Sequence, residues 1–184
     1  MRLLLLAAPG GGKGTQGERL ASLYAVQHIS SGDVLRAEAH AGTTVGREVA
    51  GYQQRGDLVP DQIVFDLLIP VVATAAARGG YILDGFPRTV PQAVQAFEVA
   101  RRLDFTLDAA VYLNVPEPVL LRRLLDRART DDTAEVIEHR LRVFAETTSP
   151  LIAYYRDRGI LVEVNGDQPV EAITAEIQAH LPGS

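Results

Sequence analysis

The chain has 184 residues, 47% of them hydrophobic and 22% charged, a composition that fits one folded domain with a sizeable core and excludes a wholly disordered chain. Its 18 basic and 23 acidic residues give a formal net charge of −5, so we expect no general binding to nucleic acids or membrane surfaces. The absence of cysteine excludes disulfide bonds and cysteine-ligated zinc, and agrees with a reducing compartment.

Short apolar runs bounded by turn residues predict strands of a parallel sheet at residues 3–8, 81–83, 109–115 and 160–164. The first run is too short for the hydrophobic region of a signal peptide, and no run is long enough to span a membrane. Helical spacing predicts helices at residues 15–25, 61–78, 91–103, 116–127, 133–158 and 169–181, the fifth of them kinked or interrupted at Pro150.

The alternation of these elements predicts an α/β fold with helices on both faces of the sheet and a ligand site at the carboxyl ends of the strands. Residues 30–60 contain helical stretches and glycines but no convincing strand. We therefore expect them to form a helical insertion over the sheet.

The strongest motif is Ala-Ala-Pro-Gly-Gly-Gly-Lys-Gly-Thr at residues 7–15, directly after the first strand. Glycines allow backbone N–H groups to approach a phosphate, and the following helix and Lys13 supply positive charge. Lys13 is the only lysine among the 18 basic residues. Ala7 and Gly14 depart from the strict phosphate-loop pattern, and a glycine-rich turn without a ligand is the alternative. We expect Ala7 to be tolerated with a negative φ angle.

A second motif, Asp-Gly-Phe-Pro-Arg-Thr at residues 84–89, follows the second strong strand. Asp84 could bind Mg²⁺ or its waters, and Arg88 could bind a phosphate through two N–H groups. A turn that contains glycine and proline without any function is the alternative interpretation.

Arginines cluster around a short polar turn at residues 127–132, which contains Asp131 and Asp132. Such a cluster suits the charge of phosphoryl transfer, although a solvated face with ion pairs is the alternative. Its members are Arg122, Arg123, Arg127, Arg129 and Arg140.

Together the segments at residues 10–16, 30–36, 56–60 and 84–88, with Asp131-Asp132 and Arg140, resemble the adenylate kinases among the nucleoside monophosphate kinases. The resemblance covers essentially the whole chain. It implies a fold of the P-loop NTPase type with a five-stranded parallel sheet. It also implies one kinase domain over residues 1–184, with a core (1–29, 60–125 and 133–184), a helical NMP-binding insertion (30–59) and a very short lid (126–132).

The same resemblance implies the site residues. Those implied for ATP are Gly10, Gly11, Gly12, Lys13, Gly14, Thr15, Arg123, Arg127 and Gln168. Those implied for AMP are Ser31, Arg36, Asp57, Leu58, Val59, Gly85, Phe86, Pro87, Arg88, Gln92, Arg129 and Arg140. The residues implied for catalysis are Lys13, Arg88, Arg127, Arg129 and Arg140. The resemblance also implies that Asp84 and Asp33 orient magnesium-bound water.

The implied activity is reversible transfer of the ATP γ-phosphoryl group to AMP, which yields two ADP and serves adenine nucleotide homeostasis. We expect Mg²⁺ but no zinc, and a cytoplasmic monomer that binds neither nucleic acid nor membranes. Gln92 and Ser31 favour AMP as the acceptor. The alternatives are a UMP/CMP kinase, another small-molecule P-loop kinase, or a non-catalytic nucleotide-binding switch, which the choice of phosphoryl acceptor would distinguish.

Overall fold

The structure is a computed structural model that describes residues 1–127 and 133–181. Its centre is a five-stranded sheet in the order β2-β3-β1-β4-β5, in which every neighbouring pair is parallel. The strands are β1 (Arg2–Leu6), β2 (Gln27–Ser30), β3 (Tyr81–Asp84), β4 (Ala109–Asn114) and β5 (Leu161–Asn165). The predicted parallel α/β fold is confirmed.

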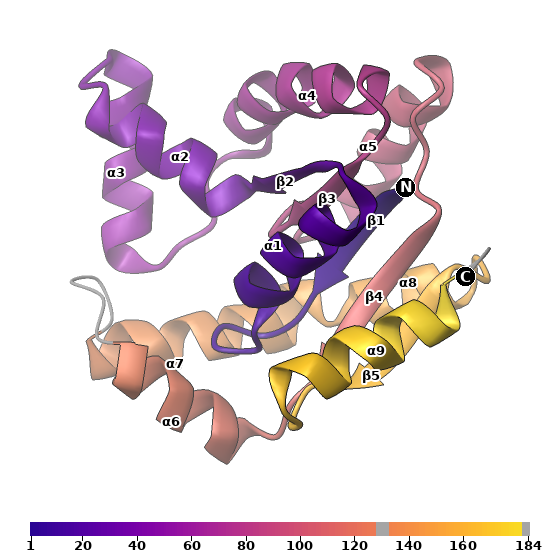
Figure 1. The fold of residues 1–184 in the computed structure, drawn as a ribbon. Coiled ribbons are helices and arrows are strands. Elements are labelled where there is room, and N and C mark those ends of the chain that lie inside the picture. The colour runs from indigo at the N-terminus through magenta and orange to yellow at the C-terminus, as the bar shows by residue number, and fades with distance from the viewer. Residues whose placement is uncertain (128–132, 182–184) are drawn as a thin grey trace.

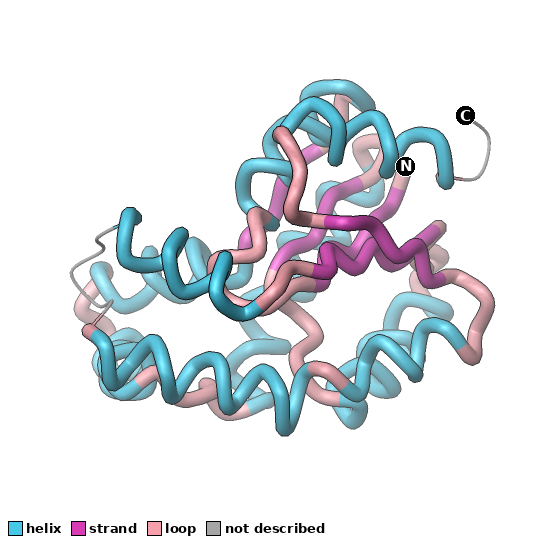
Figure 2. Tube along the Cα trace, turned by 90° about the horizontal axis from the view of Figure 1, so that it is seen from below, coloured by secondary structure: helices cyan, strands magenta, loops and turns pink. Residues whose placement is uncertain are grey.

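Helices lie on both sides of this sheet (Figures 1 and 2). They are α1 (Lys13–Tyr24), α2 (Ser31–His40), α3 (Thr44–Arg55), α4 (Asp61–Ala77), α5 (Val90–Arg102), α6 (Glu117–Arg127), α7 (Ala134–Val143), α8 (Pro150–Arg156) and α9 (Val170–His180). Among the described helices, none has both the length and the apolar composition needed to cross a membrane.

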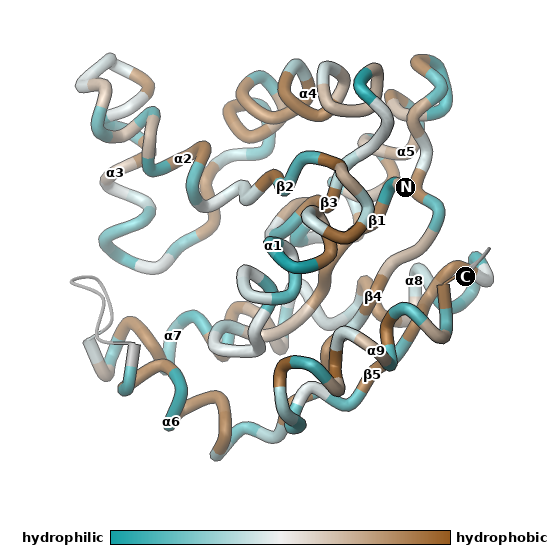
Figure 3. Tube along the Cα trace, viewed as in Figure 1, coloured by the Kyte–Doolittle hydropathy of each residue, from teal (hydrophilic) through white to brown (hydrophobic). Residues whose placement is uncertain are grey.

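The central strand β1 is buried on both faces because its successive side chains point in opposite directions. Leu3 and Leu5 belong to one hydrophobic cluster, which residues of α1 and α9 complete. Leu4 and Leu6 belong to the other, which residues of α4, α5 and α8 complete. Figure 3 shows that α4 is largely hydrophobic, as its burial requires, whereas α3 is largely hydrophilic.

The strand β2 was absent from the strands predicted by apolar runs. It is short and lies at the edge of the sheet, next to β3. Only Ile29 of its four residues is buried, so the hydrophobic pattern that identifies central strands does not form here. After β2 the chain enters α2 and α3, which project beside the sheet (Figure 1), and residues 31–60 contain no strand.

The predicted interruption near Pro150 is confirmed and takes a specific form. A π-helical turn, η1 (Phe144–Thr148), separates α7 from α8. Proline has no N–H to donate and its ring crowds the preceding turn, so an α-helix cannot continue undisturbed. The N–H of Ser149 donates instead to the carbonyl oxygen of Phe144, five residues back, at 2.8 Å.

Candidate active site

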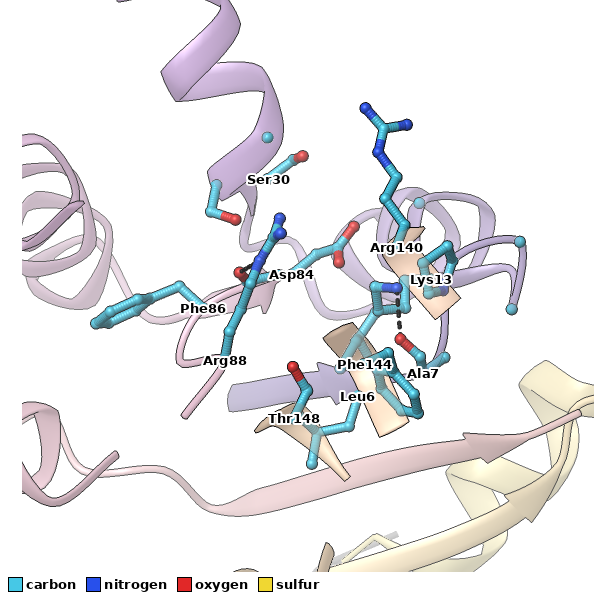
Figure 4. Close-up of a pocket in the computed structure, with 18 of the residues that line it drawn as sticks. Leu6, Ala7, Lys13, Ser30, Asp84, Phe86, Arg88, Arg140, Phe144 and Thr148 are labelled. Carbon is cyan, nitrogen blue, oxygen red and sulfur yellow. Dashed lines mark hydrogen bonds between the residues drawn. The ribbon is translucent and has the colours of Figure 1, made fainter. Parts of the chain in front are cut away.

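A cleft of about 700 Å³ opens at the carboxyl ends of the strands β1, β2 and β3. Its walls come from the loop between β1 and α1, from the start of α2, from the segment after β3, and from α7 with the π-helical turn. Figure 4 shows side chains from these segments around the same space. This is the edge at which a parallel sheet with helices on both faces binds its ligands.

The loop between β1 and α1 has the backbone shape that a phosphate site requires. Gly10 and Gly12 have φ angles of 81° and 90°, a conformation that residues with a Cβ atom rarely adopt. The helix α1 begins at Lys13, so its free N–H groups and the positive end of its dipole face the loop. The ammonium group of Lys13 donates to the carbonyl oxygen of Ala7 at 2.8 Å (Figure 4).

Ala7 occupies the position of the first glycine in the strict pattern, and the structure shows how it fits. The φ angle of Ala7 is not positive, as predicted. A Cβ atom built on Gly11 would lie only 2.5 Å from the Cβ atom of Ala7. The space for the Ala7 methyl group therefore exists because residue 11 is glycine.

Across the cleft, Asp84 ends β3 and a turn follows it, with Arg88 held by a 2.8 Å hydrogen bond from its Nε to the carbonyl oxygen of Gly85. Burial lowers the pKa of the Arg88 guanidinium, the charge of Asp84 opposes this shift, and the charges of Arg140 and Arg36 lower the pKa further. Three guanidinium groups therefore act on one region of the cleft. Such a concentration of positive charge suits a phosphate ligand.

Two polar side chains beside Arg88 are almost fully buried. Gln92 is 2% exposed, its Oε1 accepts from the backbone N–H of Arg88 at 2.7 Å, and its Nε2 donates to Asp61 at 2.5 Å. Ser31 is 1% exposed, and its hydroxyl oxygen has no hydrogen-bond partner in the described structure. A buried hydroxyl without a partner is costly, so Ser31 is suited to a ligand that supplies one.

The comparisons with known proteins agree with this architecture. Residues 5–160 match the family model described as "Adenylate kinase". The chain belongs to the adenylate kinase family. It is 46% identical to the adenylate kinase of Parasynechococcus marenigrum strain WH8102 over 96% of both chains. It is 43% identical to adenylate kinase 1 of Synechocystis sp. (96% of this chain, 94% of the relative), and 42% identical to the adenylate kinase of Thermobifida fusca (95% and 94%).

The adenylate kinase family transfers a phosphoryl group between ATP and AMP, and this enzymatic activity agrees with the function expected from the sequence. Most of the family-implied site residues meet in the cleft. The lining includes Gly10, Gly11, Gly12, Lys13, Gly14, Thr15, Ser31, Asp33, Arg36, Asp57, Leu58, Val59, Asp84, Gly85, Phe86, Pro87, Arg88, Gln92, Arg123, Arg140 and Gln168.

Two residues implied for ATP, Arg123 and Gln168, both line the cleft, and Arg123 contacts the segment that precedes Gln168. Arg123 of α6 donates to the carbonyl oxygen of Gly166 at 3.1 Å and lies 3.7 Å from Asp167. Gln168 donates from Nε2 to Glu176 at 2.5 Å. The guanidinium plane of Arg123 is thus fixed beside the segment that carries Gln168.

The side chains of the arginines assigned to the predicted short lid lie outside what the structure describes. Arg127 is the last residue of α6, and only its backbone is described. Arg129, Asp131 and Asp132 lie outside the described residues. Their assignment therefore stays a prediction from the resemblance.

Phe144 and Thr148 are among the lining residues that the motifs did not indicate. They lie at the two ends of the π-helical turn, and both line the cleft (Figure 4). The wider turn changes the direction of side chains relative to an α-helix, and π-helical turns occur frequently at functional sites. Pro150 is the signal in the sequence that could have pointed to this segment.

Proposed function

We propose that the cleft transfers the γ-phosphoryl group of ATP to AMP by holding the two nucleotides on opposite sides. The observation that carries this proposal is the arrangement of Lys13 and the glycine-rich loop opposite Arg36, Arg88 and Arg140. One side suits a triphosphate at the N-terminus of α1. The other suits the phosphate of a monophosphate acceptor.

ATP would bind with its phosphates on the backbone N–H groups of residues 10–15 and with Lys13 on the transferring group. Arg123 would cover the base, and the backbone at Gln168 would contact it; both residues line the cleft. Arg127 would approach the phosphates from the end of α6. The glycines at positions 10–12 and 14 keep side chains away from this surface.

AMP would bind on the far side. Arg36, Arg88, Arg129 and Arg140 would hold its phosphate, and the buried hydroxyl of Ser31 would accept or donate a hydrogen bond there. The residues that would surround its ribose and base are Asp57, Leu58, Val59, Gly85, Phe86, Pro87 and Gln92, all of them in the cleft lining. The insertion 30–59 would thereby form the acceptor site.

Transfer in this site needs no general base, since the attacking phosphate oxygen of AMP is already anionic near neutral pH. The protein would act by positioning the two phosphates and by stabilising the charge that spreads over the transferring group. Lys13, Arg88, Arg127, Arg129 and Arg140 would supply the positive charge. The short lid 126–132 and the insertion would exclude water, which competes as an acceptor.

Mg²⁺ fits this site as an ion carried mainly by the nucleotide. The described residues contain no cluster of three or more acidic, histidine or cysteine side chains that could form a complete metal site. The carboxylate of Asp84 nevertheless lines the cleft near Lys13 (Figure 4), and Asp33 lines it from α2. These two carboxylates would orient the waters of the bound ion, which would neutralise phosphate charge.

The proposed working form is a cytoplasmic monomer. The monomer is supported by the fact that a single chain supplies every assigned residue. Size-exclusion chromatography with light scattering tests the monomer directly. A stable dimer would contradict this part of the proposal.

The decisive assay offers Mg-ATP with AMP, UMP, CMP, GMP or water as the acceptor and measures each diphosphate. We expect rapid ADP formation that depends on AMP. Lys13→Ala should lower this rate by about a thousandfold while the protein stays folded, because it removes a charge at the transferring group. Arg78→Ala, at an exposed position outside the cleft lining, is the control and should behave as wild type. ATP binding without transfer would overturn the proposed function.

A further inference from the structure

The amide of Gln92 is fixed by two partners from different parts of the fold. Its Oε1 accepts from the backbone N–H of Arg88 at 2.7 Å, and its Nε2 donates to Oδ1 of Asp61 at 2.5 Å. Gln92 is 2% exposed and lines the cleft, whereas Asp61 is exposed, begins α4 and is not part of the lining. Asp61 therefore contacts Gln92 from outside the nucleotide cleft.

The chemistry of the two partners determines which way the amide points. A backbone N–H group can only donate, so it selects the oxygen of the Gln92 amide. A carboxylate can only accept, so Asp61 selects the nitrogen. Rotating the amide by 180° would place two donors together at Arg88 and two acceptors together at Asp61, with both hydrogen bonds lost.

Each end of the amide keeps one unused position. Oε1 has a second lone pair, and Nε2 has a second proton. The inference requires that these two positions lie side by side, on the edge of the amide that faces the cleft, where they would present an acceptor next to a donor. Adenine carries the complementary pair, with a donor at its 6-amino group and an acceptor at N1. Hypoxanthine, the base of IMP, carries the reverse pair, with an acceptor at O6 and a donor at N1.

We propose that Asp61 is a specificity-determining residue that holds the Gln92 amide in the orientation that accepts adenine and rejects a 6-oxopurine. Asp61 acts through Gln92 and is a positioning residue. The inference rests on the proposed function, in which Gln92 lies at the acceptor base.

The test replaces Asp61 by asparagine, which is isosteric and can donate as well as accept. IMP is the sharpest competitor for AMP, because the two bases differ only in the pattern at positions 1 and 6. We expect Asp61→Asn to lower the ratio of kcat/KM for AMP to kcat/KM for IMP by about tenfold, the size of one charge-assisted hydrogen bond. Arg88 still opposes rotation of the amide, so discrimination should fall but remain. The change should appear mainly in the KM of the acceptor, with the KM for ATP unchanged.

Asp66→Asn is a matched control on the same helix. Asp66 is exposed and accepts from Nε2 of Gln62 at 2.7 Å, the same type of contact, but neither residue lines the cleft. The ratio of kcat/KM for AMP to kcat/KM for IMP should be the same in Asp66→Asn as in wild type. Thermal unfolding of both variants verifies that each is folded.

Gln92→Ala separates failure of this inference from failure of the proposed function. If it raises the KM for AMP while Asp61→Asn leaves the AMP to IMP ratio at the value of Asp66→Asn, Asp61 does not set specificity. If Gln92→Ala leaves the KM for AMP unchanged, the proposed base contact is wrong and the inference fails with it.

Discussion

Ala7 and Gly11 are a complementary pair of residues in the phosphate loop. The strict motif has glycine at position 7, and here the added methyl group is accommodated beside Gly11, whose N–H donates to the carbonyl oxygen of Ala8 at 3.0 Å. A Cβ atom on Gly11 would lie 2.5 Å from that of Ala7 and 2.9 Å from the Ala8 oxygen. Because residue 7 is alanine rather than glycine, position 11 has no room for a side chain.

We expect Gly11→Ala to destabilise the protein by about 1–3 kcal/mol, the usual cost of overpacking, and to raise the KM for ATP because the loop must shift. Adding Ala7→Gly to this variant should restore part of the loss, because it removes the closer of the two clashes. Urea unfolding and the KM for ATP measure both effects.

Gly14→Ala is the control for this cycle, because its Cβ atom would meet no atom within 4 Å. It should leave the free energy of unfolding unchanged or raise it by about 0.5–1 kcal/mol, as expected for alanine in a helix. Strict additivity of Ala7→Gly and Gly11→Ala would show that the two positions do not interact.

At the scale of the elements, the π-helical turn connects the position of Pro150 to the shape of the cleft. The hydroxyl of Thr147 donates to the carbonyl oxygen of Val143 at 2.6 Å, and that of Ser149 donates to the carbonyl oxygen of Ala145 at 2.6 Å. These two hydroxyl groups thus form hydrogen bonds with carbonyl groups in and beside the widened segment. Phe144 and Thr148 reach the cleft from the same segment.

Pro150→Ala restores an N–H donor and removes the ring that crowds the preceding turn. We expect the segment to become α-helical, with a free energy of unfolding at least as high as that of wild type. The side chains of Phe144 and Thr148 should then turn relative to the cleft, so the KM of at least one nucleotide should rise several-fold. Steady-state kinetics identical to wild type would contradict a role for the π-helical turn in shaping the site.

The elements that sequence patterns predicted well are those with a strong local signal. Central strands such as β1 are continuous apolar runs, and the glycines of the phosphate loop follow one of them directly. The edge strand β2, in which only Ile29 is buried, has no such signal and was missed. Pro150 predicted that the long helix would be interrupted, but a π-helical turn depends on which carbonyl and N–H groups then find each other.

The residues of the candidate site also divide into those that a local motif identifies and those that it does not. Asp84 ends a strand, and Lys13 and Arg88 lie shortly after strands, and the carboxyl ends of these strands meet in the parallel sheet. Local motifs were therefore enough to bring the three residues together. The contact between Asp61 and Gln92 joins residues 31 positions apart, and that between Asp57 and His139 joins residues 82 positions apart. Such pairs depend on how α4, α5 and α7 pack, and local sequence motifs do not indicate that packing.

For the molecule as a whole, several contacts link the helical insertion to α7. Nε2 of His139 lies 2.8 Å from a carboxylate oxygen of Asp57, in the segment between α3 and α4. Beside it, Arg140 donates to the carbonyl oxygen of Gln53 at 3.4 Å, and the backbone of Gly56 lies against α7. Two parts of the proposed acceptor site are thereby held together without a nucleotide.

The charge on Asp57 should make this link sensitive to acid. Arg55, through a hydrogen bond of 2.8 Å, and His139 hold the pKa of the Asp57 carboxyl below its ordinary value of 3.8. A carboxyl whose pKa is lowered by folding stabilises the folded state above its unfolded pKa, and this contribution disappears as the pH falls through the folded pKa. The contribution should therefore be present at about pH 5 and should shrink below pH 3.8.

Urea unfolding of wild type and Asp57→Asn without nucleotide, at about pH 5 and about pH 3, tests this pH dependence. Wild type should exceed the variant in stability at the higher pH, and the difference should decrease at the lower pH as Asp57 is protonated. Asp57 is partly exposed and its ion pairs are screened by solvent, so the difference should stay modest. Asp157→Asn is the control, since Asp157 has no ion pair in the part of the chain that the structure describes. An equal difference between wild type and Asp57→Asn at both pH values would mean that the link does not depend on the charge of Asp57.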